Sequence, residues 1–294
     1  MGFDTAYEAI AEETGDQRWA FGTGFADPLA GVDTTVPDGV PAAGLAAYCL
    51  MLGDDALIMS HRLQEWLARA PELEEETALA NIALDLLGQA RLLLSRAGHA
   101  DGTGRDEDAY AFGRAEHEFR NVRLAEVADA DFGGLIARLL VFSTWRLALL
   151  SRLRDSRDPV LAAVAAQGVK EVAYHRDYAA QWLLRLAGGT DYSRARMAAG
   201  LAAVAPLTAE LFAISDPERS LRAAQVAPDP AGLRAEVEAV LAAVLDQAGL
   251  AWPEVPGMPG VAGRRGREGV HTEAMGHLLA ELQSVARAHP GATW

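Results

Sequence analysis

Apolar residues recur every three or four positions along most of the chain from residue 44 onward. In the first such segment the intervals are 3, 4, 3, 4 and 3, set by Cys49, Leu52, Ala56, Met59, Leu63 and Trp66. This spacing places the apolar side chains on one face of a helix, as in helical bundles. The pattern therefore predicts a helix from about 44 to 66.

Turn and capping signals divide the rest of the chain into further helices. Pro71 interrupts the pattern, and the next segment opens with acidic residues, which favour the positive end of a helix dipole. Asp158 and Pro159 form a good N-cap and first-position pair, and Gly188-Gly189 is a typical helix stop. The predicted helices are 72–97, 131–155, 159–187, 191–213, 230–248 and 272–288.

The connections between these helices indicate a fold class. The first two helices are joined tightly, as are the third and fourth, whereas residues 98–130 separate the two pairs. Two antiparallel pairs joined by one long crossover are the ferritin-like arrangement. We therefore predict an all-α, ferritin-like four-helix bundle over residues 43–294, with additional C-terminal helices.

Residues 1–42 differ from the rest because they are rich in Gly, Pro and Asp and lack a helical period beyond a possible short helix at 3–13. This composition is typical of an extended arm. Trp19, Phe21 and Phe25 are poor candidates for exposure to water, so we expect the arm to lie on a protein surface.

Amino-acid composition excludes some classes of binding partner and indicates the cellular compartment. The 294 residues are 50% hydrophobic and carry a net charge of −15, which argues against nucleic acids or anionic membranes as partners. Charged residues and Pro206 interrupt the longest apolar runs, which argues against a membrane span. Cys49 is the single cysteine, and no signal peptide is evident at the start. These features predict a soluble, cytoplasmic protein.

The fold raises the question of a di-iron centre, which takes a Glu from each of two helices and a Glu-x-x-His from each of the other two. Only His271 has a glutamate, Glu268, three residues before it, and this pair lies in a loop. The third predicted helix contains no acidic residue from Phe132 to Arg154. The sequence therefore lacks a complete set of iron ligands.

A remnant of such a site is nevertheless recognisable in the second and fourth helices. Asp85 and Gln89 share one face of the apolar stretch LANIALDLLGQARLLL, and Glu171 and His175 lie on the seam of the fourth helix. Leu86 and Val172 stand where ligand glutamates would be expected. The four polar residues could form a buried hydrogen-bond network or contact a metal. We favour a hydrogen-bond or proton-sharing cluster in place of iron, with no metal or catalytic residue in this chain.

Three long motifs resemble a known family. They are GDDALIMSHRLQEWLARAPELEEETALANIALDLLGQAR, SRDPVLAAVAAQGVKEVAYHRDYAAQWLLRLAGGTD and GVHTEAMGHLLAELQ, together with a terminal Trp294. They resemble the C subunits of the multicomponent phenylacetyl-CoA oxygenase, also called an epoxidase, over about residues 43–294.

The resemblance implies a role that composition and spacing do not. C subunits of this family are ferritin-like, lack the di-iron centre and pair with a homologous catalytic A subunit that carries it. With a reductase that takes electrons from NADPH, the complex would epoxidise the ring of phenylacetyl-CoA in aerobic phenylacetate degradation. This chain would then be no enzyme by itself and hold no cofactor, with the di-iron and reductase cofactors in its partners.

Two further clusters have a functional and a structural interpretation. Arg264, Arg265 and Arg267 could bind the phosphates of CoA, or form a solvated basic loop. A second cluster could recruit an adventitious metal, although the apolar face of its helix favours packing; it comprises His271, Glu273, His277 and Glu281. Motifs of other enzyme classes, such as GxSxG or a Walker loop, do not occur.

Two hypotheses of different classes follow. In the first, the chain is a structural subunit that supports the catalytic subunit. In the second, it is a ferritin-like metalloenzyme with an unusual ligand set from Asp85, Glu171, His175 and the His271 segment. The acid-free third helix and the aliphatic Leu86 and Val172 favour the first.

Overall fold

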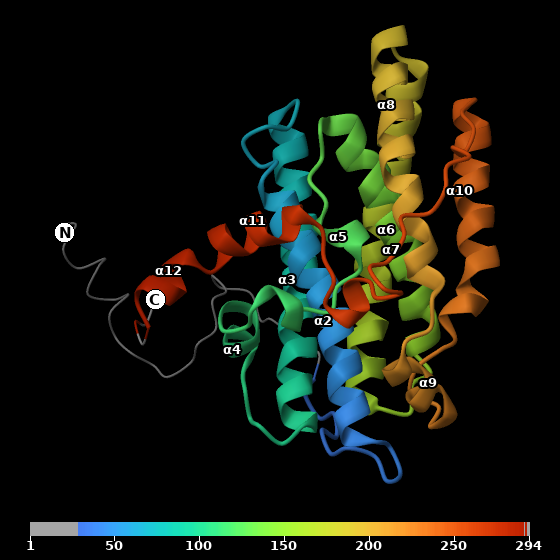
Figure 1. Ribbon diagram of the computed structural model, residues 1–294. Helices are drawn as coiled ribbons and strands as arrows, with labels where there is room; N and C mark the ends of the chain where they lie inside the picture. The colour runs from blue at the N-terminus through green and yellow to red at the C-terminus, as the bar shows by residue number, and fades with distance from the viewer. Residues whose placement is uncertain (1–28, 291, 293–294) are drawn as a thin grey trace, which may run out of the picture.

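The computed structural model describes residues 29–290 and residue 292, and α-helices dominate it (Figure 1). The predictions for Trp19, Phe21, Phe25, Trp294 and a helix at 3–13 lie outside the described residues. The main helices are α2 (Ala42–Gln64), α3 (Leu73–Ala100), α6 (Phe132–Leu153), α7 (Pro159–Gly188), α8 (Asp191–Val204), α10 (Arg234–Ala248) and α11 (Glu273–Leu282). Within the described residues, strand pairing is limited to one isolated bridge between Val261 and Arg264.

Helices α2, α3, α6 and α7 form the predicted ferritin-like bundle. α2 packs along α3 and α6 packs along α7, and the long connection between the two pairs crosses the molecule (Figure 1). That crossover contains α4 (Glu107–Phe112), a 3₁₀ turn at Glu116–Glu118 and α5 (Arg123–Glu126). The predicted fold class and the predicted crossover are both confirmed.

The C-terminal third covers the bundle on two sides. α8 packs on α6, and α10 contacts both α6 and α7, whereas α11 and α12 (Ser284–Ala288) extend away to one side (Figure 1). Two helices differ from prediction. The 191–213 segment changes to a 3₁₀ helix at Ala205–Phe212, where Pro206 lacks an N–H, and the 272–288 segment breaks at Gln283.

Capping residues begin several helices as the sequence predicts. The side chain of Asp158 accepts a hydrogen bond from the Leu161 N–H at 2.9 Å, and Pro159 occupies the first turn of α7. Asp131 accepts from the Gly134 N–H at 2.9 Å and begins α6 in the same way. These caps satisfy N–H groups that the helix itself leaves unpaired.

Buried arginines are an unexpected feature of the core. Five of them pair with carboxylates that are also buried: Arg96–Asp158, Arg114–Asp54, Arg123–Glu210, Arg138–Asp129 and Arg267–Asp55. Arg114–Asp54 and Arg138–Asp129 join the crossover to the bundle, Arg267–Asp55 joins the C-terminal segment to the bundle, and Arg123–Glu210 joins the crossover to the C-terminal segment. Charge pairing therefore fixes the irregular parts of the chain against the helices.

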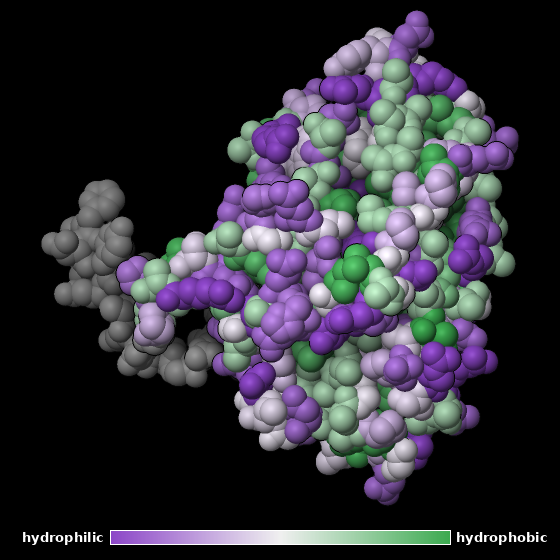
Figure 2. Space-filling view, in the orientation of Figure 1, coloured by the Kyte–Doolittle hydropathy of each residue, from purple (hydrophilic) through white to green (hydrophobic). Residues whose placement is uncertain are grey.

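Several helices are also apolar enough to be considered as membrane spans. Four segments are long and apolar enough to cross a membrane by length and composition alone: α2, α3, α6 and Asp191–Phe212. The prediction that the interrupting charges argue against a membrane span is therefore not supported by these criteria. In the fold, the most apolar window of α6 is completely buried within the protein. On the face shown in Figure 2, hydrophilic and hydrophobic groups are interspersed. The apolar side chains of α6 therefore serve to pack the bundle.

The crossing of α6 and α8 depends on a glycine. A Cβ added to Gly200 would lie 2.6 Å from the carbonyl oxygen of Gly133, closer than real contacts allow. We expect Gly200→Ala to lower the free energy of unfolding by about 1–3 kcal/mol through overpacking. The matched control is Gly88→Ala in α3, where a Cβ would meet nothing within 4 Å. Urea unfolding should show the control to be more stable by about 0.5–1 kcal/mol, and equal effects of both changes would contradict this account.

Candidate functional site: a polar cluster in the bundle core

Each of the four bundle helices contributes a polar side chain to the interior. Asp55 of α2, Gln89 of α3, Arg146 of α6 and Glu171 of α7 together form what we call the core cluster. Arg146 donates from Nε to Oε1 of Gln89 at 2.9 Å, and Gln89 donates from Nε2 to Oε2 of Glu171 at 2.8 Å. Arg146 also donates from Nη1 to the Leu52 carbonyl at 3.3 Å. The cluster thus links all four helices.

The packing of α7 explains how Gln89 reaches Glu171. A Cβ on Gly168 would lie only 3.2 Å from Cδ of Gln89, so the glycine leaves room for the amide beside the helix. The other oxygen of Glu171 accepts from Gln167 Nε2 at 2.7 Å. Both oxygens of this carboxylate are therefore engaged with amides.

Arg146 is the positive charge of the core cluster. Its side chain is fully buried, and burial lowers the pKa of the guanidinium to about 10, although the charges of Asp55 and Glu171 act against this. It therefore remains protonated at neutral pH. Among the described residues, no hydrogen-bond partner is present for its Nη2. A fixed cation belonging to the chain thus lies between the helices.

The predicted remnant site separates into two pairs in the structure. Gln89 and Glu171 belong to the core cluster, whereas His175 Nε2 lies 3.0 Å from Oδ2 of Asp85. The imidazole is buried and the carboxylate is 37% exposed. Leu86 and Val172, at the predicted lost glutamate positions, are buried apolar side chains of the core.

A groove on the outside of the bundle runs past both pairs. It lies between α3 and α7, has a volume of about 380 Å³ and is lined by Asp85, Gln89 and Glu171 among others. The Glu107 carboxylate at its edge binds Arg91 and Ser95. The polar residues of the core are thus connected to the surface through this groove.

The donor set does not fit a di-iron centre. Within residues 29–290 and 292, no three His, Cys, Asp or Glu side chains form a group that could hold a metal ion. Di-iron centres of this fold take their ligands from all four helices of the bundle core, and here that core contains the amide of Gln89 and the guanidinium of Arg146. A second cation placed beside Arg146 would be repelled. The side chains of the core cluster can form hydrogen bonds and exchange protons.

Arg267 lies in a different environment from the one that the sequence suggested. Its fork donates to both oxygens of Asp55, at 3.0 and 2.8 Å, and to the carbonyls of Met51 and Arg120. Its side chain is only 8% exposed. Burial works against the charged form, but Asp55 and Glu218 outweigh it and raise the pKa of Arg267. Binding a CoA phosphate would require this arginine to leave Asp55.

The other two arginines of the predicted basic cluster lie nearer the surface. Arg264 is exposed and donates to the Glu268 carbonyl at 3.0 Å, and the backbone N–H of Arg265 donates to the Glu268 carboxylate at 2.8 Å. The structure therefore separates the three arginines, and only Arg264 and Arg265 keep side chains accessible to an anion.

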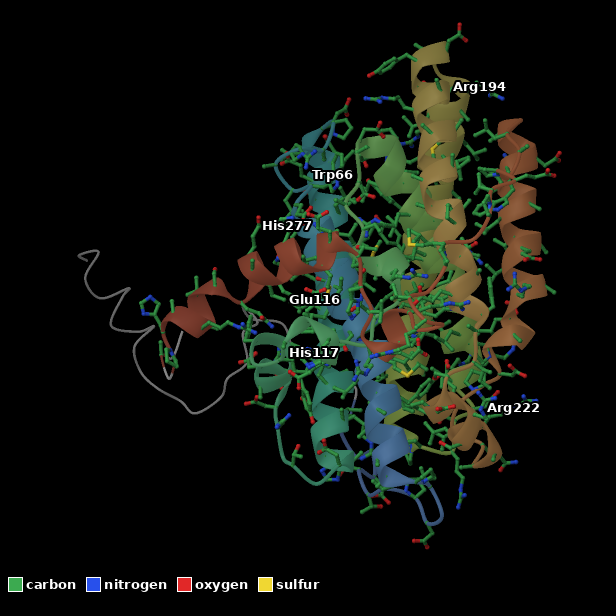
Figure 3. The ribbon with its side chains drawn as sticks, viewed as in Figure 1. Trp66, Glu116, His117, Arg194, Arg222 and His277 are labelled. Carbon is green, nitrogen blue, oxygen red and sulfur yellow. The ribbon has the colours of Figure 1, made fainter. Side chains whose placement is uncertain are left out.

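The histidine cluster of the C-terminal segment is also divided. His271 is buried against Glu126 of α5, 2.7 Å from its carboxylate, and so lies apart from the Asp85–His175 pair of the bundle. His277 and Glu273 form a weak pair at 3.8 Å on the exposed side of α11 (Figure 3). The ligand set proposed for an independent metalloenzyme is thus distributed over separate places.

The His271–Glu126 pair makes stability depend on pH. Burial alone would lower the pKa of His271, but its hydrogen bond to Glu126 and the negative charge there raise it overall. The resulting stabilisation is complete below the ordinary pKa and is lost as pH rises through the raised value. We expect the stability advantage over His271→Asn to shrink between about pH 6 and pH 8 in denaturant titrations. A constant difference would contradict this assignment.

Sequence reasoning missed Asp55 and Arg146, two of the three charged members of the core cluster. Asp55 lies next to the predicted seam residue Ala56, and Arg146 stands inside the apolar third helix. Arginines within a largely apolar, acid-free helix are the available signal, because a buried charge needs partners on neighbouring helices.

Comparison with known proteins identifies the family. A sequence profile described as "Phenylacetic acid catabolic protein" matches residues 33–294.

This chain belongs to the phenylacetic acid catabolic protein family.

Within the family, the chain is similar to the C subunit of the 1,2-phenylacetyl-CoA epoxidase of Escherichia coli (strain K12). The two are 44% identical over 250 residues, which cover 85% of this chain and 99% of the relative. The resemblance to C subunits of the phenylacetyl-CoA oxygenase, predicted from three motifs, is confirmed.

Proposed function

We propose that this chain is the structural, non-catalytic subunit of a multicomponent di-iron oxygenase that epoxidises the ring of phenylacetyl-CoA in aerobic phenylacetate degradation. Its partner is a homologous A subunit that carries the di-iron centre. A reductase supplies electrons from NADPH, and the complex is located in the cytoplasm. The similarity to the C subunit of an epoxidase supports the substrate class and the assembly.

One observation carries the non-catalytic role. Arg146 is fully buried among the four bundle helices, from which a ferritin-like oxygenase takes its metal ligands, and it is bonded to Gln89, which in turn is bonded to Glu171. The core thus obtains from a guanidinium the positive charge that iron would supply. The four-helix core is therefore stabilised without a bound metal, and the chain needs no oxygen-activating centre of its own.

Reconstitution tests this proposal. Purified A subunit and reductase components are assayed for NADPH-dependent epoxidation of phenylacetyl-CoA, with and without this chain. We expect the chain alone to be inactive, to co-elute with the A subunit and to raise its activity. Activity of this chain with the reductase alone would refute the proposal, as would full activity of the A subunit in its absence.

A contact with CoA is a separate part of the proposal. Arg264 and Arg265 could bind CoA phosphates at a subunit boundary, because guanidinium groups match phosphate oxygens. The test is acyl-CoA affinity of the assembled complex after Arg264→Ser and Arg265→Ser together. Unchanged affinity with unchanged assembly would dispose of this contact and leave the structural role intact.

A further inference from the structure

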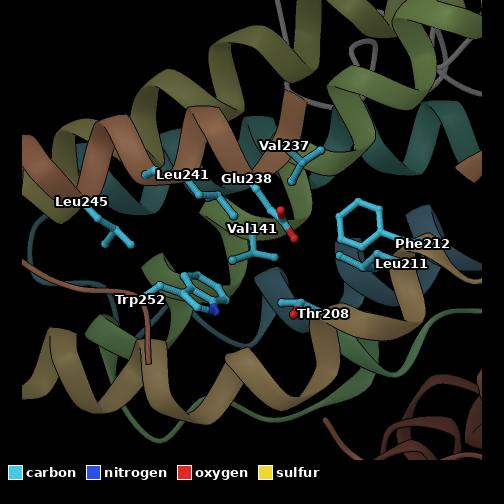
Figure 4. Close-up of a pocket in the computed structure, with 10 residues that line it drawn as sticks. Val141, Thr208, Leu211, Phe212, Val237, Glu238, Leu241, Leu245 and Trp252 are labelled. Atoms are coloured by element: carbon cyan, nitrogen blue, oxygen red, sulfur yellow. The ribbon is translucent and has the colours of Figure 1, made fainter. Parts of the chain in front are cut away.

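A cavity separate from the core cluster lies between α6, α10 and the 3₁₀ helix Ala205–Phe212. It has a volume of about 270 Å³ and a mostly apolar lining. Figure 4 shows the rings of Trp252 and Phe212 at its two ends, with Val141 and Glu238 between them. Val237, Leu241 and Leu245, which are buried and four residues apart on α10, form one wall.

The volume sets the size of the occupant. An engineered cavity of about 150 Å³ in another protein binds benzene, so this one holds a single aromatic ring with a small substituent. An acyl-CoA is far too large to enter. Aromatic side chains at both ends offer edge or face contacts to a ring.

The cavity offers hydrogen-bond acceptors beside the indole N–H donor of Trp252. The Thr208 hydroxyl donates to the Ala205 carbonyl at 2.9 Å, so its oxygen is left to accept. Glu238 receives a bond from Arg234 at 3.2 Å, and its carboxylate points toward the space between the two rings (Figure 4). Arg234 itself lies over the Phe212 ring at 4.5 Å. A carboxylate-bearing ligand would therefore face the negative charge of Glu238.

We propose that this cavity binds an uncharged, single-ring aromatic molecule that carries a hydrogen-bond donor, of which phenol is the simplest. The ring packs between Trp252 and Phe212, and the hydroxyl donates to the Glu238 carboxylate. The site does not depend on the proposed subunit role, because its residues lie outside the core cluster.

The first experiment titrates the full chain with phenol, toluene and phenylacetate, followed by ligand-observed NMR and calorimetry. We expect phenol to bind saturably at a single site and toluene to bind about fivefold more weakly, the effect of one lost hydrogen bond. Phenylacetate should not compete. Absence of saturable binding at millimolar phenol would overturn the proposal, as would stronger binding of phenylacetate than of phenol.

Two variants test the location. Val141→Phe fills the cavity and should abolish phenol binding. Because it can disturb folding, Glu238→Gln is the second variant: this side chain is exposed, and the change keeps its size while removing its charge. Because the amide oxygen of glutamine still accepts but lacks the charge, Glu238→Gln should weaken phenol about two- to threefold, leave toluene unchanged and allow phenylacetate to compete. Phenol binding unaffected by Glu238→Gln, or by Val141→Phe in a correctly folded variant, would contradict the assigned site.

Discussion

Replacing Arg267 with methionine should lower the free energy of unfolding by about 3–5 kcal/mol, because it leaves a buried carboxylate without its partner. Asp55 is fully buried, and both of its oxygens accept from Arg267. Burial already raises the pKa of Asp55, so in the variant this group should take up a proton. A carboxyl with a raised pKa loses stability as pH increases, so the deficit should grow from acidic to neutral pH.

Arg264 provides the matched control for this experiment. It lies three residues away in the same loop but is exposed, and it donates only to a backbone carbonyl. Arg264→Met should therefore change the stability by no more than about 0.5 kcal/mol. Equal effects of the two substitutions in urea unfolding would contradict the structural role of Arg267. The double variant Asp55→Asn with Arg267→Met should recover part of the loss.

Replacing Asp158 with alanine should also be costly, by about 3–5 kcal/mol, because two functions end together. Asp158 caps α7 through the Leu161 N–H and pairs with the buried Arg96. Arg96 in turn donates to the carbonyls of Thr34 and Thr35. Its loss of a partner should therefore also lower hydrogen-exchange protection around α7 and the segment that precedes α2.

An exposed cap separates the two contributions. Asp106 begins α4, and its side chain accepts from the Ala109 N–H at 2.8 Å without a buried arginine beside it. Asp106→Ala should cost only about 0.5–2 kcal/mol, the usual value of an N-cap. If Asp158→Ala costs no more than Asp106→Ala, the buried pair with Arg96 contributes nothing measurable.

The bundle could be predicted from the sequence because its information is local. Apolar spacing of three and four positions reports a helix face, and Asp158-Pro159 and Gly188-Gly189 report where α7 begins and ends. The long crossover could be predicted because the number of residues between the second and third helices is read directly from the sequence. The break at Gln283 could not be predicted, because the apolar pattern continues through it.

The polar core could be predicted only in part, because its pairing is set between helices. The i, i+4 spacing predicted that Asp85 shares a helix face with Gln89 and that Glu171 shares one with His175; in the structure Gln89 and His175 are buried, whereas Asp85 and Glu171 are partly exposed. It could not show that Gln89 would bind Glu171 while Asp85 would bind His175. Arg146 enters from a third helix far away in the sequence, and its long side chain reaches partners that no local pattern encodes.

In the basic loop, too, the sequence does not show which side chain is buried. Arg264, Arg265 and Arg267 are alike in the sequence and lie within four positions. In the fold, only Arg267 reaches Asp55, because the turn around the buried Gly266 directs that side chain inward. Burial of a surface-type residue depends on the long-range path of the chain, which residue type alone does not reveal.

The most direct test of the central claim is the iron, manganese and zinc content of the chain expressed alone in iron-replete cells and purified without chelator. With Arg146 and Gln89 in place of ligands, we predict a well-folded helical protein with essentially no bound metal. About two irons per chain, the content of a filled di-iron centre, would contradict the account and make this chain an oxygenase in its own right.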